Sequence, residues 1–269
     1  MTAPARPWAV GAAIAIAATL AGAGCGSKHA SPAATLQPAR QKLSPSGSLT
    51  VFAAASLTEA FDDEKAALSR TDPGLRLTYA FAGSQALAQQ IVQGARADVF
   101  ASADQSSMQT LVLAGLVGTP RVFARNRLEI AVAPGNPKHV AGLRDLARAG
   151  LVVVLVDPSV PAGNYSRQAL SKAGVSVNPR SLELDVKSAL AKVASGEADA
   201  AIVYVSDVLA AGSRASGVPI ADDENVVATY PIAVVKATAN RAGAEAFVDQ
   251  VVSGSGRQAI LAHGFLPAS

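Results

Sequence analysis

The segment VFAAASLTEAF, residues 51–61, shows how the chain is organised. Its first half is a short apolar run that predicts a buried strand, and its second half has the apolar spacing of a helix. Ser56 stands at the change from strand to helix, where its side chain could cap the helix, and Glu59 three residues later would complete a capping box. A strand that ends directly before a helix start is the repeating unit of α/β proteins.

Three further segments repeat this arrangement: FAGSQALAQQI (81–91), DPSVPAGNY (157–165) and LDVKSAL (184–190). Gly83 permits a tight turn before Ser84, and Asp185 is a natural N-cap before Val186. A helix start exposes backbone N–H groups without intrahelical partners and the positive end of the helix dipole. One such start indicates only capping. Several of them pointing into one cleft would bind an anion without any cationic side chain.

Short β-rich runs alternate with helical patterns from Leu49 onward, which predicts an α/β fold with mostly parallel strands. The predicted strands cover residues 49–54, 75–81, 98–101, 128–133, 151–156, 182–184, 200–205, 226–229 and 232–235. The predicted helices begin near Ser56, Ser84, Asp104, Gly142, Gly163, Val186, Ser206, Arg241 and Gly256.

Two strand-like segments interrupted by proline, residues 127–134 and 226–236, predict the paired crossovers of a two-lobed protein. Lobe one would consist of residues 47–126 plus 230–269, and lobe two of residues 127–229. A cleft between lobes is a usual ligand site. A single continuous sheet is the alternative.

The N-terminal segment has the features of an export signal. Arg6 precedes an apolar run, residues 8–20, that is too short and wrongly flanked for a stable membrane span. LAGAGC, residues 20–25, resembles a bacterial lipoprotein signal, although Gly22 replaces the usual aliphatic residue. We therefore expect a signal peptide over residues 1–24, lipid attachment at Cys25 and a flexible tether to residue 46, which would anchor the protein to the outer face of the cell membrane. Ordinary signal cleavage or a free thiol at Cys25 are the alternatives.

Composition and motifs argue against two other functions. The formal net charge is only +3, and no run of lysine and arginine is interleaved with aromatic residues, so nucleic acid is not an expected partner. The chain has no G-x-S-x-G elbow, P-loop, H-E-x-x-H motif or Cys/His cluster, and its three histidines lack motif neighbours. We therefore expect no enzyme, no catalytic residue, no cofactor and no direct ligands for a bare metal cation.

Six segments, in chain order, together resemble the periplasmic molybdate-binding proteins of ABC transporters. They are residues 51–61, 81–91 and 157–165 quoted above, with ADVFASADQ (97–105), AIVYVSD (201–207) and YPIAVV (230–235). The resemblance implies a two-lobed type II periplasmic-binding-protein fold that holds a tetrahedral dianion, molybdate or tungstate, in the cleft. It also implies delivery of the ion to the permease of an ABC importer and, through the permease, to its ATPase. We expect the protein to be a monomer.

The resemblance also implies which groups hold the ion. Ser56 and Ser84 would supply hydroxyl and backbone donors from lobe one, Ala162 and Val186 would supply backbone N–H groups from lobe two, and Tyr204 would supply a phenol O–H. By themselves these residues are equally explained by capping, turn geometry and core packing.

The charge state of the ligand bears on its identity. Molybdate, tungstate and sulfate only accept hydrogen bonds near neutral pH, whereas phosphate retains a proton, so a donor-only site disfavours phosphate by about 1–3 kcal/mol. Asp185 would spoil such a site if its carboxylate faced the ligand, but as an N-cap it should turn to its own helix. Another oxyanion such as sulfate is an alternative ligand, because the sequence does not give the volume of the cavity. A serine-dependent enzyme is the second alternative, although neither Ser56 nor Ser84 has an evident base.

Overall fold

The computed structural model describes residues 46–269. The predicted signal peptide, Cys25 and all but the last residue of the predicted tether lie outside the described residues. Within residues 46–269, no helix is both long enough and apolar enough to cross a membrane.

The described part of the chain alternates strands and helices, as predicted. The strands are β1 (Gly47–Ala54), β2 (Leu75–Ala82), β3 (Val99–Ala101), β4 (Arg121–Val132), β5 (Val153–Val156), β6 (Leu182–Glu183), β7 (Ala200–Tyr204), β8 (Ser216–Pro219), β9 (Val227–Val234) and β10 (Leu266–Pro267). The α-helices are α1 (Thr58–Thr71), α2 (Ser84–Val92), α3 (Gln105–Leu113), α4 (Pro161–Lys172), α5 (Val186–Ala194), α6 (Val205–Ala211), α7 (Arg241–Ser253) and α8 (Ser255–Ala262). Three short 3-10 turns are η1 (Ala55–Leu57), η2 (Leu143–Ala147) and η3 (Gly212–Arg214).

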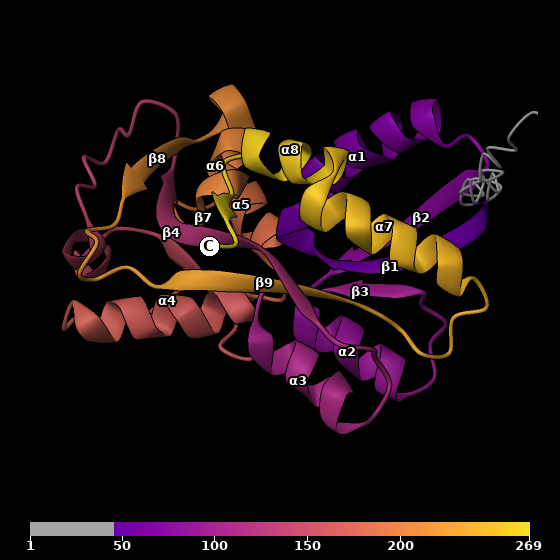
Figure 1. The fold of residues 1–269 in the computed structure, drawn as a ribbon. Coiled ribbons are helices and arrows are strands. Elements are labelled where there is room, and N and C mark those ends of the chain that lie inside the picture. The colour runs from indigo at the N-terminus through magenta and orange to yellow at the C-terminus, as the bar shows by residue number, and fades with distance from the viewer. Residues whose placement is uncertain (1–45) are drawn as a thin grey trace, which may run out of the picture. The chain divides into compact units, whose positions relative to one another are not determined.

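The strands follow the order β2-β1-β3-β9-β4-β7-β5-β6, with β8 and β10 also pairing with β4. β1 is parallel to β2 and β3, and β5 is parallel to β6 and β7. The long strand β4 connects these two groups, because residues 121–127 pair with β9 whereas residues 128–132 pair with β7 and β8. In Figure 1, β4 and β9 run side by side between the two groups. The two-lobed α/β fold is thus confirmed, while the lobe boundaries assigned above stay a prediction.

Both strand groups are covered by helices. In Figure 1, α1, α7 and α8 lie on one side of β1–β3, and α2 and α3 lie on the other. In the second lobe α4 and α5 both pack on β5 and β7. This explains the continuous apolar runs of the sequence, since every residue of β5 and β7 is buried.

The structure corrects several predicted elements. β4 begins at Arg121, seven residues before the predicted start at residue 128, and β9 is one continuous strand through Pro231. Proline is tolerated there because the β4–β9 register shifts between Val122, the partner of Pro231, and Ala124. The predicted helix near Gly142 is only the 3-10 turn η2. The short strands β8 and β10 were not predicted.

Candidate anion-binding site

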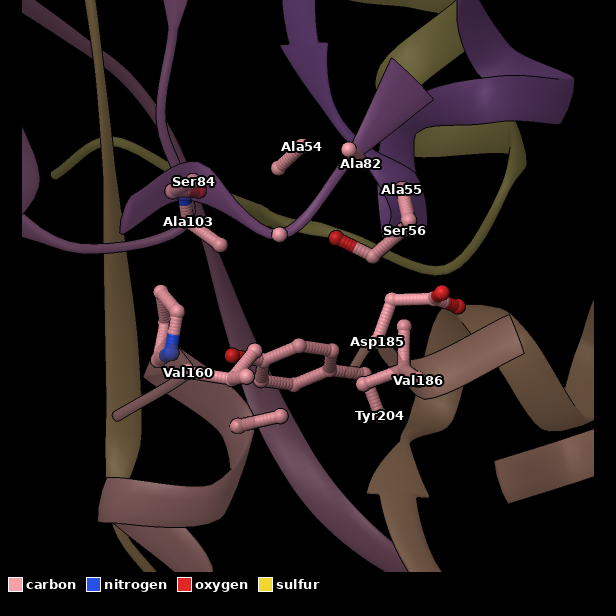
Figure 2. Close-up of a pocket in the computed structure, with 13 residues that line it drawn as sticks. Ala54, Ala55, Ser56, Ala82, Ser84, Ala103, Val160, Asp185, Val186 and Tyr204 are labelled. Carbon is pink, nitrogen blue, oxygen red and sulfur yellow. The ribbon is translucent and has the colours of Figure 1, made fainter. Parts of the chain in front are cut away.

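One cavity brings together the chain segments in which a strand or loop gives way to a helix. It is lined by the end of β1 and the start of η1, by the end of β2 and the start of α2, and by the starts of α4 and α5, with the last residue of β7. The structure places all five predicted site residues on its wall: Ser56, Ser84, Ala162, Val186 and Tyr204. In Figure 2, Ser56 and Ser84 lie across the cavity from Val186 and Tyr204. The predicted convergence of helix starts is therefore present.

Small residues make the rest of the wall, among them Ala55, Ala82, Gly83 and Ala103. Their short side chains let the backbones of several segments come close together. The free space for a water-sized sphere is about 10 Å³, which is room for about one water molecule.

Ser84 is held as a hydrogen-bond donor to the cavity. Its side chain belongs to the first residue of α2 and is 1% exposed. The backbone N–H of Ala103 donates to Ser84 Oγ over 2.9 Å. Because this bond uses an acceptor site of the hydroxyl, the hydroxyl proton remains available for a ligand.

Ser56 does not cap α1, which corrects the predicted capping box. The 3-10 turn η1 lies between β1 and α1, so α1 begins at Thr58 after Leu57, without a side-chain cap. Ser56 is buried within this turn, and its Oγ lies 2.9 Å from the hydroxyl of Tyr230. The Glu59 carboxylate forms an ion pair with Lys187 instead of completing a capping box.

Tyr204 carries a buried hydroxyl that needs a partner. The residue is 1% exposed, and its hydroxyl has no hydrogen-bond partner within the described part of the chain. Burial raises the pKa of the Tyr204 hydroxyl well above its usual value, so it stays protonated. A buried polar group without a partner destabilises a protein by about 1–3 kcal/mol, and such a group in a cavity wall is a sign of a ligand.

The start of α4 is brought to the cavity by a glycine. α4 begins at Pro161, two residues before the predicted start, and because proline has no N–H the first free backbone donor is that of Ala162. A Cβ atom at Gly163 would lie only 2.0 Å from the carbonyl oxygen of Asp157 and 2.4 Å from that of Val156. Any larger residue at position 163 would push the start of α4 away from the end of β5.

Asp185 turns to its own helix, as predicted. Its Oδ1 accepts from the Ser188 backbone N–H and its Oδ2 from the Ser188 hydroxyl, both over 2.9 Å. The carboxylate is thus engaged at the start of α5 rather than offered to a ligand. The backbone N–H of Val186, the first residue of α5, is left without an intrahelical partner.

An ion-pair group behind the cavity was missed by the sequence analysis. Lys187 Nζ lies 2.7 Å from Glu59 Oε2 and 3.1 Å from Asp207 Oδ1. Asp207 Oδ2 also accepts from the Tyr204 backbone N–H over 3.1 Å. Burial alone would lower the pKa of Lys187, but the carboxylates of Asp207 and Glu59 outweigh it and raise the pKa, so the ammonium group stays charged. The group links the starts of α1, α5 and α6.

The cavity is electrically unusual for an anion site. Its described wall contains no lysine, arginine or histidine, and the charge of the nearby Lys187 is balanced by two carboxylates. Residues 46–269 also contain no group of three histidine, cysteine, aspartate or glutamate side chains that could hold a metal ion. Asp185 also lines the cavity, with its carboxylate turned to Ser188. The donors that the arrangement offers an anion are neutral: three hydroxyl groups and the N–H groups of helix starts.

The chain is similar to known solute-binding proteins. The family described as bacterial extracellular solute-binding protein matches residues 49–266. The chain is 43% identical over 251 residues to the molybdate-binding protein ModA of Mycobacterium tuberculosis (strain H37Rv), covering 93% of this chain and 94% of that protein. It is 34% identical to the ModA protein of Escherichia coli (strain K12), over 83% of this chain and 90% of that protein.

A solved structure shows the same fold. The periplasmic molybdate-binding protein of Azotobacter vinelandii superposes with a TM-score of 0.70 at 22% identity, covering 81% of this chain and 98% of that protein. The predicted periplasmic-binding-protein fold is confirmed by this likeness.

Proposed function

The chain belongs to the bacterial extracellular solute-binding proteins, and we propose that it captures molybdate or tungstate for an ABC importer. The observation that carries the proposal is the donor-only cavity, in which the buried Tyr204 hydroxyl has no partner among the described residues. The molybdate-binding relatives at 43% and 34% identity supply the identity of the ion.

The donor set matches a fully deprotonated oxyanion. Each oxygen of molybdate accepts hydrogen bonds and none donates. The hydroxyl groups of Ser56, Ser84 and Tyr204 and the backbone N–H groups of Ala162 and Val186 would surround such an ion from both lobes. A phosphate O–H would be poorly accommodated, because the Asp185 carboxylate, the acidic group of the wall, is turned to Ser188.

Entry of the ion requires the lobes to separate. The cavity has room for about one water molecule, which is less than a tetrahedral oxyanion occupies. The lobes meet near the cavity, where a Cβ atom at Gly83 would lie 3.0 Å from the carbonyl oxygen of Leu184. We propose that the ion first meets one lobe and that the donors of the other then complete its shell and stabilise the closed state.

The cavity lacks the parts of a serine hydrolase, so we propose a binding protein without catalytic residues or cofactor. A nucleophilic serine needs an adjacent base that a third group orients. The hydrogen-bond partner of Ser56 is the Tyr230 hydroxyl, and that of Ser84 is the Ala103 N–H, neither of which is a base. Molybdate is the cargo of the site rather than a reactant.

We further propose that Cys25 is lipidated and holds the protein at the outer face of the cell membrane. The support is the lipoprotein-like segment LAGAGC, residues 20–25, which lies outside the described residues. The partners would be the permease of an ABC importer and, through it, the ATPase, with the binding protein acting as a monomer. Labelling with a radioactive fatty acid in cells, with Cys25→Ser as control, tests the anchor.

Equilibrium dialysis against sodium molybdate, with molybdenum counted by mass spectrometry, tests the proposed cargo. We expect one molybdenum per chain, displaced by tungstate but not by a large excess of phosphate at pH 8. Displacement by sulfate at equal concentration would reassign the cargo to sulfate. No bound molybdenum would reject the proposal.

A further inference from the structure

We propose that Tyr230 determines anion selectivity by holding the Ser56 hydroxyl as a donor to the cavity, so that the site rejects oxyanions that carry a proton. This inference rests on the proposed function. Tyr230 does not line the cavity. It belongs to β9, which pairs with β4 between the two strand groups. It would act only through Ser56, which makes it a positioning residue.

Tyr230 and Ser56 are in close contact and are buried from solvent. The Tyr230 hydroxyl lies 2.9 Å from Ser56 Oγ, and the two residues are 0% and 3% exposed. The Tyr230 ring is fixed by edge-on packing against three other rings, with centroid distances of 5.3 Å to Phe265, 5.9 Å to Tyr204 and 6.2 Å to Phe123. The direction of the hydroxyl is therefore set by the core and not by solvent.

The chemistry of the two hydroxyls favours Tyr230 as the donor. Burial raises the pKa of the Tyr230 hydroxyl well above its usual value, so it keeps its proton and must place it on an acceptor. The neighbouring Asn126 side chain has other partners, because its Nδ2 donates to Ser206 Oγ over 2.8 Å and its Oδ1 accepts from the Arg127 N–H over 2.9 Å. Ser56 Oγ lies at 2.9 Å, and because a phenol is a stronger donor and a weaker acceptor than an aliphatic hydroxyl, we assign Tyr230 as the donor of the pair.

This assignment fixes the chemistry that Ser56 presents to a ligand. With an acceptor site of Ser56 Oγ filled by Tyr230, the Ser56 proton is left to point at the cavity. Ser84 is held in the same way by the Ala103 N–H, a backbone group that substitution cannot remove. Tyr230 is therefore the side chain through which the donor character of the site can be changed without touching its wall.

Tyr230→Phe tests the inference, because it removes the hydroxyl and keeps the ring packing. Ser56 Oγ then becomes free to accept, and the proton of hydrogen phosphate gains a partner. We expect the ratio of molybdate to phosphate affinity at pH 8, measured by competition dialysis of the whole chain, to fall about tenfold, which corresponds to about 1.4 kcal/mol. Tyr79→Phe is the matched control, since Tyr79 also carries a buried hydroxyl but does not line the cavity, and it should leave the ratio unchanged.

A double-mutant cycle distinguishes positioning from general loosening. The double variant Ser56→Ala/Tyr230→Phe should have the same molybdate-to-phosphate affinity ratio as Ser56→Ala alone, because the side chain through which Tyr230 acts is absent from both. An unchanged ratio in Tyr230→Phe, or an equal change with and without Ser56, would overturn the inference. Failure of the unsubstituted chain to bind molybdate would instead reject the proposed function.

Discussion

Lys187 in α5 and Glu59 in α1 form an ion pair from one lobe to the other, with 2.7 Å between Lys187 Nζ and Glu59 Oε2. The same ammonium group contacts Asp207 in α6, within its own lobe. Glu59 lies three residues after Ser56, and Lys187 directly follows Val186. The ion pair therefore joins two chain segments that line opposite sides of the cavity, and it can form only when the lobes are together.

Glu59→Gln is expected to weaken the binding of every oxyanion by the same factor. The substitution removes the interlobe ion pair and leaves the donors in place, so it lowers the closed population without changing selectivity. The Glu59 side chain is 38% exposed, and ion pairs of this kind contribute about 0.2–1 kcal/mol, so affinity should fall by a factor of about 1.4 to 5.

The control for Glu59→Gln is Glu183→Gln. Glu183 forms a similar ion pair with Lys192, over 2.6 Å, within the second lobe. Loss of the Glu183–Lys192 ion pair should leave the affinity for molybdate unchanged. Calorimetric titration of both variants with molybdate and tungstate checks the prediction, and a change in the molybdate-to-tungstate ratio in Glu59→Gln would speak against a purely conformational role.

Tyr204→Phe and Ser84→Ala should both weaken molybdate binding but differ in their effect on stability. Each removes a hydrogen bond to a charged ligand, which contributes about 1.5–3 kcal/mol, or roughly a ten- to hundredfold change in affinity. Without ligand, Tyr204→Phe removes a hydroxyl that has no partner in the described structure, so stability should not fall. Ser84→Ala leaves the buried Ala103 N–H without its acceptor and should lower the free energy of unfolding by about 1–3 kcal/mol.

Urea denaturation and calorimetry separate the two effects in these variants. Unchanged molybdate affinity in both would remove Tyr204 and Ser84 from the site. Equal loss of stability in both would mean that the Tyr204 hydroxyl has a partner in the ligand-free protein.

Gly163→Ala should abolish tight molybdate binding by displacing the backbone at the start of α4. The added Cβ would come within 2.0 Å of the Asp157 carbonyl oxygen, so the start of α4 must move and take the Ala162 N–H with it. Overpacking of this kind costs about 1–3 kcal/mol of stability. Gly118→Ala is the control, because its Cβ would meet only the Val234 carbonyl oxygen, at an ordinary 3.7 Å. Thermal denaturation and dialysis should distinguish them, and normal binding by Gly163→Ala would show that the α4 start is not needed.

Glu64→Gln should stabilise the protein at alkaline pH. Glu64 is 1% exposed and accepts from the Ser255 hydroxyl over 3.2 Å. Burial raises the pKa of Glu64 to about 7 from 4.5, more than the Ser255 hydrogen bond lowers it. As the pH rises, Glu64 therefore ionises in the unfolded chain before it ionises in the folded protein. The free energy of unfolding is highest below pH 4.5 and falls as the pH rises to about 7.

The size of this effect follows from the pKa difference. At about 1.36 kcal/mol for each pKa unit, ionised Glu64 reduces the free energy of unfolding by about 3 kcal/mol at pH 8. Glutamine keeps an acceptor for Ser255 but does not ionise. Urea denaturation at pH 5 and pH 8 should therefore show a smaller loss of stability in Glu64→Gln than in the unsubstituted chain, and identical pH profiles would contradict the prediction.

The position of the proposed donors on the cavity wall was predictable because they belong to local patterns. Helix starts such as those at Ser84 and Val186 follow from the change of apolar period and from the neighbouring Gly83 and Asp185, and the resemblance to a family assigned them to one site. The extra turn before α1 was not predictable from the same signals, so Ser56 was taken for a cap.

The groups behind the donors were not predictable, because they are distant in sequence. Tyr230 stands 174 residues from Ser56, and Lys187 stands 128 residues from Glu59. Nothing in a single sequence pairs such residues; only the folded chain does. Tyr230 lies within the segment YPIAVV, residues 230–235, that carried part of the resemblance, but no local pattern gave it a role.

Calorimetric titration of the purified protein with molybdate, tungstate, sulfate and phosphate in turn tests the central claim most directly. The donor-only cavity predicts tight one-to-one binding of molybdate and tungstate, weaker binding of sulfate and no heat with phosphate. Phosphate binding as tight as that of molybdate would show that the cavity offers an acceptor after all, and no heat with any of the four ions would contradict an oxyanion-binding function.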